Sequence, residues 1–233
     1  MLYSGSTTDG GTRLFVCIED ISWGAYVYAV DVSSGNVGYL TTIPMRRSLQ
    51  SFEWNRGCLY CAGGFRPPQS ANVYLSSFQV FNVATGLWGD LPPMPQVFAL
   101  AASGVIGNQL FVAGGRCHEG FIDNDNRLST LQIFDFTTRT WRLGAPMPEA
   151  KQETCGVVVD GKLFVISGHS ASMLVYDPQS DTWTTESDIP YAGSAVRHAC
   201  AHNGRLVAFT RHGGVFERDT DGLWSRGSCG VNG

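Results

Sequence analysis

Two short segments carry residue types that bind metal ions. Asp123-Asn124-Asp125-Asn126 offers the oxygen ligands that calcium prefers, and Cys58 and Cys61 have the C-x2-C spacing found in zinc sites. An EF-hand loop needs Gly at its sixth position and Glu at its twelfth, where this chain has Leu128 and Phe134. The cysteine pair lacks a second pair of ligands, and an offset of three on a strand places the two thiols on opposite faces. We therefore predict no metal ion and no cofactor.

Catalytic arrangements are equally scarce. The sequence shows no ordered Ser/His/Asp set, no His pair with metal-ligand spacing and no paired carboxylates within one long loop. Ser180-Asp181-Thr182-Trp183 is similar to the Asp-box of sialidase propellers but lacks its glycine. It also falls at a turn position that recurs along the chain. We predict that the protein is not an enzyme.

Composition bounds the fold and the partner classes. The 233 residues suffice for one large domain, and 28 glycines with only 15% charged residues favour short strands joined by tight turns. The net charge of −4 speaks against nucleic acid and membrane surfaces as partners. No apolar run approaches the ~20 residues of a membrane span, and the first residues do not read as a signal peptide. Seven cysteines without framework spacing predict a reducing compartment, cytoplasmic or nuclear.

The elements that must position any site come from an internal repeat. A pair of small residues ends an apolar run at Leu59–Gly64, Leu110–Gly115 and Leu163–Gly168. A second marker ends a later strand and recurs at spacings of 51, 53, 42 and 42 residues, at Asp31, Asn82, Asp135, Asp177 and Asp219. A tryptophan follows this marker in four copies, at Trp88, Trp141, Trp183 and Trp224. Independent markers that keep one period indicate a repeat architecture.

Turn signals divide each repeat into four strands. Asp160-Gly161 and Asn203-Gly204 supply the positive φ angles that two-residue hairpins need. Each copy therefore predicts a four-stranded antiparallel meander whose apolar faces pack on neighbouring copies. We expect the double glycine to permit close packing, the tryptophans to lie between blades, and each marker Asp to bond the turn after it. Trp141 in particular is predicted to be buried.

These markers together resemble the kelch repeat, and the Pro-Met-rich connections are similar to those of plant F-box/kelch proteins. The resemblance implies one kelch-type β-propeller domain over residues 1–233, all-β, with about five blades of four antiparallel strands. Kelch propellers of this kind usually have six blades, so a truncated six-bladed propeller is the alternative. No F-box lies in this chain, and the sequence does not reveal whether an F-box or a further blade precedes Met1, nor the oligomeric state.

The resemblance implies a protein-interaction module, with a ubiquitin-ligase substrate adaptor as its more specific form. The alternative is a small-molecule enzyme of oxidase or epimerase type, with its site at the channel mouth. Two long loops, 65–76 and 116–129, favour recognition, because long loops on a rigid scaffold commonly carry binding residues. In a four-stranded meander these loops share a face with the blade-to-blade connections.

Basic residues and histidines are expected to gather on that face. The predicted partner-binding residues are Arg46, Arg47, Arg66, Arg116, His118, Lys151, His169, Arg197, Arg211 and His212. Kelch proteins that recruit degradation substrates often carry a basic residue at the blade-to-blade crossing, a position that Arg47 and Lys151 occupy here and that Phe98 and Ser194 do not. Local positive charge in an acidic chain predicts an acidic peptide or loop as the partner.

Overall fold

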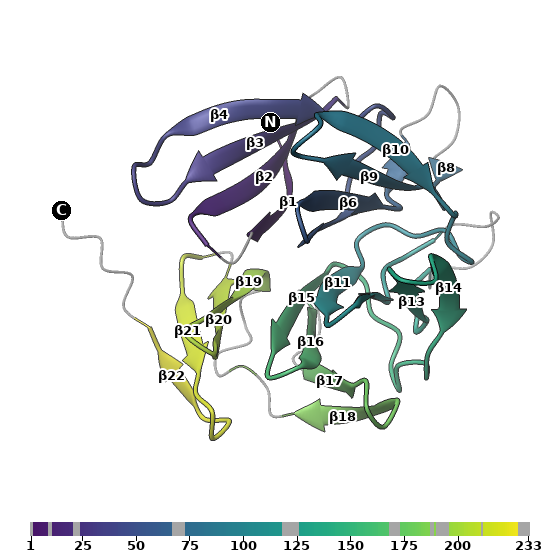
Figure 1. Ribbon diagram of the computed structural model, residues 1–233. Coiled ribbons are helices and arrows are strands. Elements are labelled where there is room, and N and C mark those ends of the chain that lie inside the picture. Colours follow the sequence, from purple (N-terminus) through teal and green to yellow (C-terminus); the bar gives the residue numbers. More distant parts are fainter. Residues whose placement is uncertain are drawn as a thin grey trace. The chain divides into compact units, whose positions relative to one another are not determined.

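The computed structural model describes residues 2–8, 11–20, 24–66, 73–117, 126–167, 173–186, 189, 196–210 and 212–227, without the side chains of 2–6 and 197. All regular elements in this part of the chain are strands, and they form five four-stranded sheets and one short hairpin (Figure 1). No helix in the described part has the length and apolarity needed to span a membrane.

Each sheet takes four strands that are consecutive within one repeat, apart from the short hairpin inserted in the second. The first contains β1 (Leu2–Thr8), β2 (Arg13–Glu19), β3 (Ala25–Asp31) and β4 (Val37–Thr42). The second contains β5 (Ser51–Asn55), β6 (Cys58–Ala62), β9 (Phe78–Asn82) and β10 (Leu87–Leu91), and the hairpin pairs β7 (Phe65–Arg66) with β8 (Val73–Tyr74).

The remaining sheets keep the same order. The third contains β11 (Ala102–Ile106), β12 (Gln109–Ala113), β13 (Leu131–Asp135) and β14 (Thr140–Leu143). The fourth contains β15 (Thr154–Val159), β16 (Lys162–Ser167), β17 (Met173–Asp177) and β18 (Thr182–Glu186). The fifth contains β19 (Val196–His202), β20 (Arg205–Thr210), β21 (Val215–Arg218) and β22 (Trp224–Arg226). The prediction of five blades of four antiparallel strands is confirmed.

The clearest difference from the predicted strand bounds lies at the start of the third blade. The sequence predicts a strand from Ala99, whereas β11 begins at Ala102. Ala99 instead pairs with Arg116, and Leu100 has a left-handed backbone with φ 60°. A left-handed residue interrupts an extended strand, so the innermost strand is shorter than its apolar run.

The chain forms two compact units. Unit 1 comprises Met1–Leu100, Arg116–Asn126 and Phe134–Arg142, and unit 2 comprises Ala101–Gly115, Arg127–Ile133 and Leu143–Gly233. The third blade contributes residues to both. That residues 1–233 make a single domain stays a prediction.

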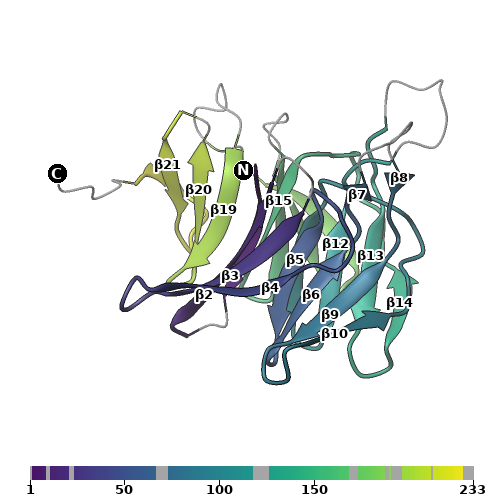
Figure 2. The same cartoon turned by 90° about the horizontal axis from the view of Figure 1, so that it is seen from above.

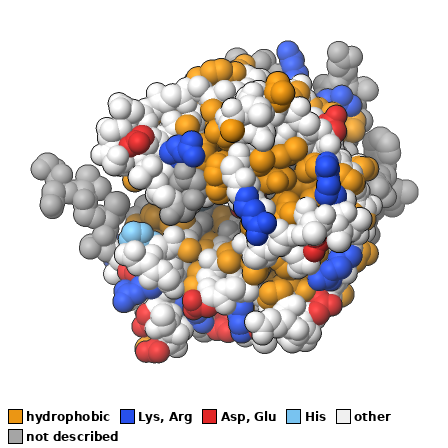
Figure 3. All heavy atoms as spheres, viewed as in Figure 1, with side chains coloured by type: hydrophobic (Ala, Val, Ile, Leu, Met, Phe, Trp, Pro, Cys, Tyr) orange, Lys and Arg blue, Asp and Glu red, His pale blue; other side chains and the backbone are white. Residues whose placement is uncertain are grey.

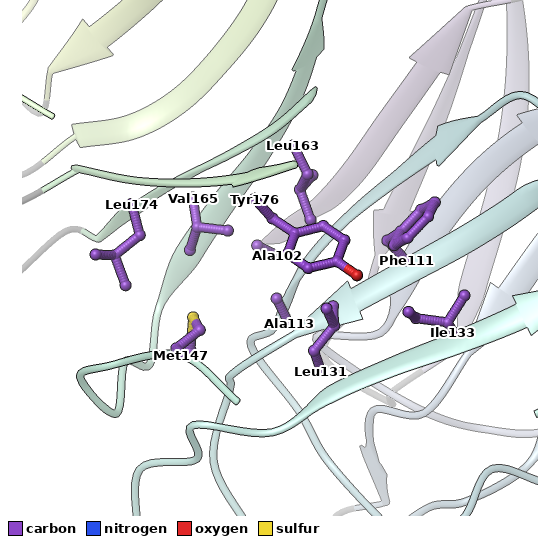
Figure 4. Close-up of a cluster of buried hydrophobic side chains, with 10 residues drawn as sticks. All are labelled: Ala102, Phe111, Ala113, Leu131, Ile133, Met147, Leu163, Val165, Leu174 and Tyr176. Carbon is purple, nitrogen blue, oxygen red and sulfur yellow. The ribbon is translucent and has the colours of Figure 1, made fainter. Parts of the chain in front are cut away.

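Each unit has its own apolar core. In unit 1, Phe15, Val27, Leu59 and Phe81 are buried between the first two blades. In unit 2, two clusters lie between successive blades, one of them around Leu163 and Tyr176 (Figure 4). Strands supply alternate side chains to each face, so every blade buries both faces only by packing on its neighbours.

The repeated tryptophans tie each blade to the one before it. The indole Nε1 of Trp88 donates to Thr41 Oγ1 at 2.9 Å, that of Trp141 to the Pro92 carbonyl at 2.9 Å, and that of Trp183 to the Ala145 carbonyl at 2.7 Å. The predicted position between blades is therefore confirmed for these three. The predicted burial of Trp141 is wrong, because all three rings remain partly exposed on the outermost strand of their blades.

Trp141→Ala is expected to lower the free energy of unfolding by about 3 kcal/mol, the lower end of the range for large aromatic truncations. The ring contacts Phe78 and Phe134 at centroid distances of 5.1 Å each, and the substitution also removes the hydrogen bond to Pro92. Denaturant unfolding measures the loss. Leu143→Ala, on the same strand and 55% exposed, is the control with little expected change. Equal midpoints for the two variants would contradict the role of Trp141.

The marker residue of each repeat caps the turn that follows it, as predicted. Asp135 Oδ1 accepts the backbone amides of Thr137 at 2.8 Å and Thr138 at 3.0 Å, and Asn82 Oδ1 accepts those of Ala84 and Thr85. In the first copy, hydrogen bonds from the hydroxyl of Ser33 and from Ser34 lower the pKa of Asp31 to about 2. The carboxylate thus replaces a backbone acceptor and fixes the turn.

Candidate functional site

A hydrogen-bonded backbone platform supports the loop-bearing end of unit 1. Ser48 pairs with Phe65, and the amide of Phe65 donates to the Ser48 carbonyl at 2.9 Å. Ala99 pairs with Arg116, with N–O distances of 3.0 and 2.8 Å. The hairpin of β7 and β8 lies at this end, whereas the turn from β9 to β10 lies at the other (Figure 2). The platform therefore holds segments from two crossings and two long loops together.

Five side chains on this platform define what we call the loop-end surface: Arg46, Phe65, Arg66, Tyr74 and Arg116. Arg46 and Arg66 are exposed, while the other three are partly exposed. The rings of Phe65 and Tyr74 lie 6.2 Å apart across the hairpin. The surface thus combines three guanidinium groups with an aromatic pair, a composition common in protein interfaces.

Arg116 has a shielded Nε, as Arg47 and Arg218 also have among the described residues. Its Nε is buried and has no hydrogen-bond partner within the described part of the chain, and none of its side-chain atoms forms an ion pair there. A shielded donor without an acceptor costs free energy. Arg116 is partly exposed as a whole, so its guanidinium can donate charged hydrogen bonds to a carboxylate. Arg116 is therefore placed to bind an anionic group.

Arg47, predicted to face a partner, is fully buried instead. Its Nη1 donates to the Gly63 carbonyl at 3.2 Å, and its Nη2 donates to Gln79 Oε1 at 2.7 Å. Gln79 Nε2 in turn donates to Asp90 Oδ1 at 2.9 Å. The guanidinium is engaged within the second blade, so this crossing residue holds the double glycine in place.

Lys151 occupies the corresponding crossing in unit 2 and is also buried, with 1% of its side chain exposed. Its Nζ donates to Glu149 Oε2 at 2.9 Å. The two crossings differ in their contacts, because the Arg47 side chain bonds Gly63 of the blade it enters, whereas the Lys151 backbone lies against Gly114 of the blade it leaves. At Gly114, an added Cβ would lie 2.7 Å from the Lys151 carbonyl oxygen. We therefore leave Arg47 and Lys151 out of the loop-end surface.

Of the other predicted residues, His212 is exposed in a turn of unit 2. His118, His169 and Arg211 lie outside the described residues, and Arg197 lies in β19 without a described side chain.

A buried carboxyl group that sequence reasoning overlooked lies close to this platform. Glu19 is fully buried, accepts a hydrogen bond from Ser48 Oγ and takes the backbone amide of Leu49 at 3.0 Å. It stands at the repeat position of the second glycine of the pair, Gly64 in the next copy. The signal that could have revealed it was a charged residue, Glu19, at a repeat position where other copies have a small residue.

A left-handed backbone recurs at the three described positions where a crossing enters the next blade. The residues are Leu49, Leu100 and Glu153, with φ angles of 56°, 60° and 51°, and they are separated by 51 and 53 residues. The Leu49 carbonyl accepts the Leu100 amide at 3.0 Å. Leucine and glutamate do not favour positive φ, so local sequence could not predict this feature.

Metal chemistry finds no support in the described part of the chain, where no group of three or more His, Cys, Asp or Glu could hold an ion. Cys58 and Cys61 both carry free thiols there. Burial raises the pKa of each, which disfavours the thiolate that a metal or an electrophile needs.

Comparisons with known proteins agree with this architecture. Two models described as Kelch motif match residues 55–95 with 98–148, and 155–190, together more than half of the chain. Mouse Kelch-like protein 35 is 27% identical over 58% of this chain and 22% of its own length. Human Kelch-like protein 33 is 28% identical over 63% of this chain and 31% of its own length.

An F-box/kelch-repeat protein of Arabidopsis thaliana is 31% identical over 54% of this chain and 38% of its own length. The chain therefore spans well under half the length of these relatives. A solved structure of YjhT superposes with a TM-score of 0.80 at 15% identity, covering 98% of this chain and 84% of that one. At this identity the likeness concerns the fold alone.

Proposed function

Because this chain belongs to the kelch-repeat family of β-propeller proteins, we propose that it works by binding a protein partner at the loop-end surface. The observation that carries the proposal is Arg116, whose buried Nε lacks an acceptor among the described residues. Arg46 and Arg66 lie exposed on the same surface. We propose an acidic peptide or loop as the partner and no catalytic role.

Charge and shape both support this assignment. The chain carries a net charge of −4, so three arginines on one surface create a field opposite to the average. Partner carboxylates would pair with the guanidinium groups, while Phe65 and Tyr74 would contact apolar side chains. Phe65 and Tyr74 are paired across a short hairpin in the free chain, so less conformational entropy is lost when a partner binds them.

The likeness to F-box/kelch proteins supports a more specific proposal, that the partner is a substrate of a ubiquitin ligase and the chain recruits it. The seven cysteines without framework spacing support a cytoplasmic or nuclear location. The half-life of the captured partner, with and without the chain, tests the adaptor role.

Charge reversal at Arg46, Arg66 and Arg116 together is expected to weaken binding of a partner captured by the native chain by well over tenfold. Each charged hydrogen bond contributes about 1.5–3 kcal/mol, and reversal adds repulsion. Arg47 stays unchanged because it is buried. Isothermal titration calorimetry measures the affinities.

The matched control reverses two exposed arginines on other strands, Arg142 and Arg226. It keeps the number of basic-to-acidic changes similar but leaves the loop-end surface intact. The proposal fails if the control weakens binding as much as the loop-end variant, or if the loop-end variant binds normally while folded.

A further inference from the structure

Two arginines occupy backbone positions that suit other residue types. Arg56, in the turn from β5 to β6, has φ 46°, and Arg139, in the turn from β13 to β14, has φ 57°. The matching positions in other repeats all have positive φ and carry Gly, Asn or Asp: Gly107, Asp160 and Asn203 for Arg56, and Gly35, Gly86, Asp181 and Gly222 for Arg139. Those residue types tolerate the left-handed region better than arginine does.

Both arginines lie near one partly exposed aromatic pair. The rings of Tyr60 and Phe136 have centroids 4.7 Å apart. Burial and the neighbouring Cys58 raise the pKa of Tyr60 to about 12, and the positive charges of Arg139 and Arg56 oppose that rise. We call Arg56, Tyr60, Phe136 and Arg139 the turn-end surface; all four belong to unit 1.

The exposure of Tyr60 is itself unusual within the repeat. The aromatic residues at the same position in three other blades, Phe15, Phe111 and Phe164, are 0%, 0% and 7% exposed. In the second blade a tyrosine replaces phenylalanine, and the ring is partly accessible. Hydrophobic atoms lie open over β6 and β9 with Lys or Arg side chains beside them (Figure 3).

One acid, Glu53, lies directly across from Tyr60 on β5, and the two arginines of this surface form no ion pair within the described part of the chain. Neither Arg56 nor Arg139 forms a side-chain hydrogen bond or an ion pair there. The acid closest in sequence to Arg139, Asp135, uses its carboxylate to cap the Thr137 and Thr138 amides. Two unpaired guanidinium groups beside an aromatic pair complement a ligand that is acidic and carries an apolar side chain.

We propose that the turn-end surface is a second recognition site, which binds an acidic protein segment through carboxylates on Arg56 and Arg139 and an apolar side chain on Tyr60 and Phe136. The residue choice at left-handed positions is the main reason. Strained backbone persists at functional positions when the side chain it presents is useful. This site lies at the end of unit 1 away from the loop-end surface, so it is independent of the function proposed above.

A competing explanation is that the arginines stabilise the fold by covering Tyr60 with their methylene stems. Glycine substitutions separate the two explanations. Arg56→Gly with Arg139→Gly installs the residue that other copies use at such φ angles, so backbone strain falls and folding is preserved. If the arginines serve binding, the melting temperature stays level or rises while binding is lost.

The probe is the peptide acetyl-Glu-Asp-Leu-Phe-Glu-Asp-amide, with acetyl-Gln-Asn-Leu-Phe-Gln-Asn-amide as its neutral counterpart. Titration is followed by backbone amide NMR shifts. The amides of Phe65, Arg66, Tyr74 and Arg116 report on the loop-end surface, and those of 58–60 and 137–141 report on the turn-end surface. We expect the acidic peptide to shift the turn-end amides and to bind at least tenfold more weakly to the double glycine variant. The neutral peptide should also bind at least tenfold more weakly than the acidic one.

A control variant with Arg46, Arg66 and Arg116 changed to Glu should keep the affinity at these amides within twofold. Shifts confined to the loop-end surface would overturn this proposal and leave the loop-end proposal standing. Unchanged binding by the double glycine variant, or a clear fall in its melting temperature, would also overturn it.

Discussion

Replacing Gly156 by alanine is expected to destabilise unit 2 by about 3 kcal/mol, the upper part of the range for overpacked cores. An added Cβ would lie 2.5 Å from the backbone nitrogen of Ser103 and 2.9 Å from its carbonyl carbon, and closer still to the carbonyl oxygen. Gly156 lies in β15 and Ser103 in β11, the innermost strands of two successive blades. Backbone atoms cannot move aside as a flexible side chain can, so the two blades must separate.

Two other glycines provide matched controls. Gly89→Ala adds a Cβ in ordinary contact, 3.7 Å from Val80 Cγ1, and should change stability by no more than about 0.5 kcal/mol. Gly161→Ala, in the same unit as Gly156, meets open space but has φ 71°, and should cost about 1 kcal/mol from backbone strain alone. Denaturant unfolding should show the smallest loss of stability for Gly89→Ala, a larger loss for Gly161→Ala and the largest for Gly156→Ala. A Gly156 variant as stable as the Gly161 variant would disprove the close approach of the two strands.

Glu19→Ala is expected to cost about 3 kcal/mol. The substitution removes the acceptor of Ser48 Oγ and of the Leu49 amide, and both donors lie at the buried start of the second blade. An unsatisfied buried donor costs about 1–3 kcal/mol. The Leu49 amide also helps hold the left-handed backbone at φ 56°, so strain there is no longer offset.

Glu19→Gln is the conservative control. The amide keeps one acceptor oxygen and nearly the same volume, so we expect it to lose about half as much stability as the alanine variant. Ser48→Ala removes only one of the two hydrogen bonds and should fall in the same range. Melting temperatures of the three variants measure the ranking. If the Glu19→Ala variant has the same melting temperature as the native chain, the buried carboxyl group does not stabilise the platform.

Local signals in the sequence were sufficient to predict the blades and their strands. Double glycines, the aspartate before each turn and the spaced tryptophans recur because each copy must build the same hairpins and present the same apolar faces. The structure confirms five sheets of four strands, with tryptophan indoles bonded across successive blades. The missed start of β11 arose at Leu100, because a leucine carries no preference for φ 60°.

The candidate site was predictable only in part. The exposed Arg46 and Arg66, together with Arg116, were placed on the loop-bearing face by topology alone, since connections of a meander alternate between its two ends. Arg47 was placed there by the same reasoning and is buried. Sequence gives its position on the crossing but not the Gly63 carbonyl and Gln79 amide oxygen that receive its guanidinium.

Periodicity and turn preferences within about fifty residues of chain are therefore sufficient to predict the strand number, the blade order, the turn chemistry and the end at which the long loops emerge. Which charged side chains are buried and which stay accessible depends on tertiary packing. Burial of Glu19, Arg47 and Lys151, and exposure of Arg56 and Tyr60, depend on what a neighbouring segment places beside them. No local sequence pattern encodes these contacts, because packing brings together residues that are far apart in the chain.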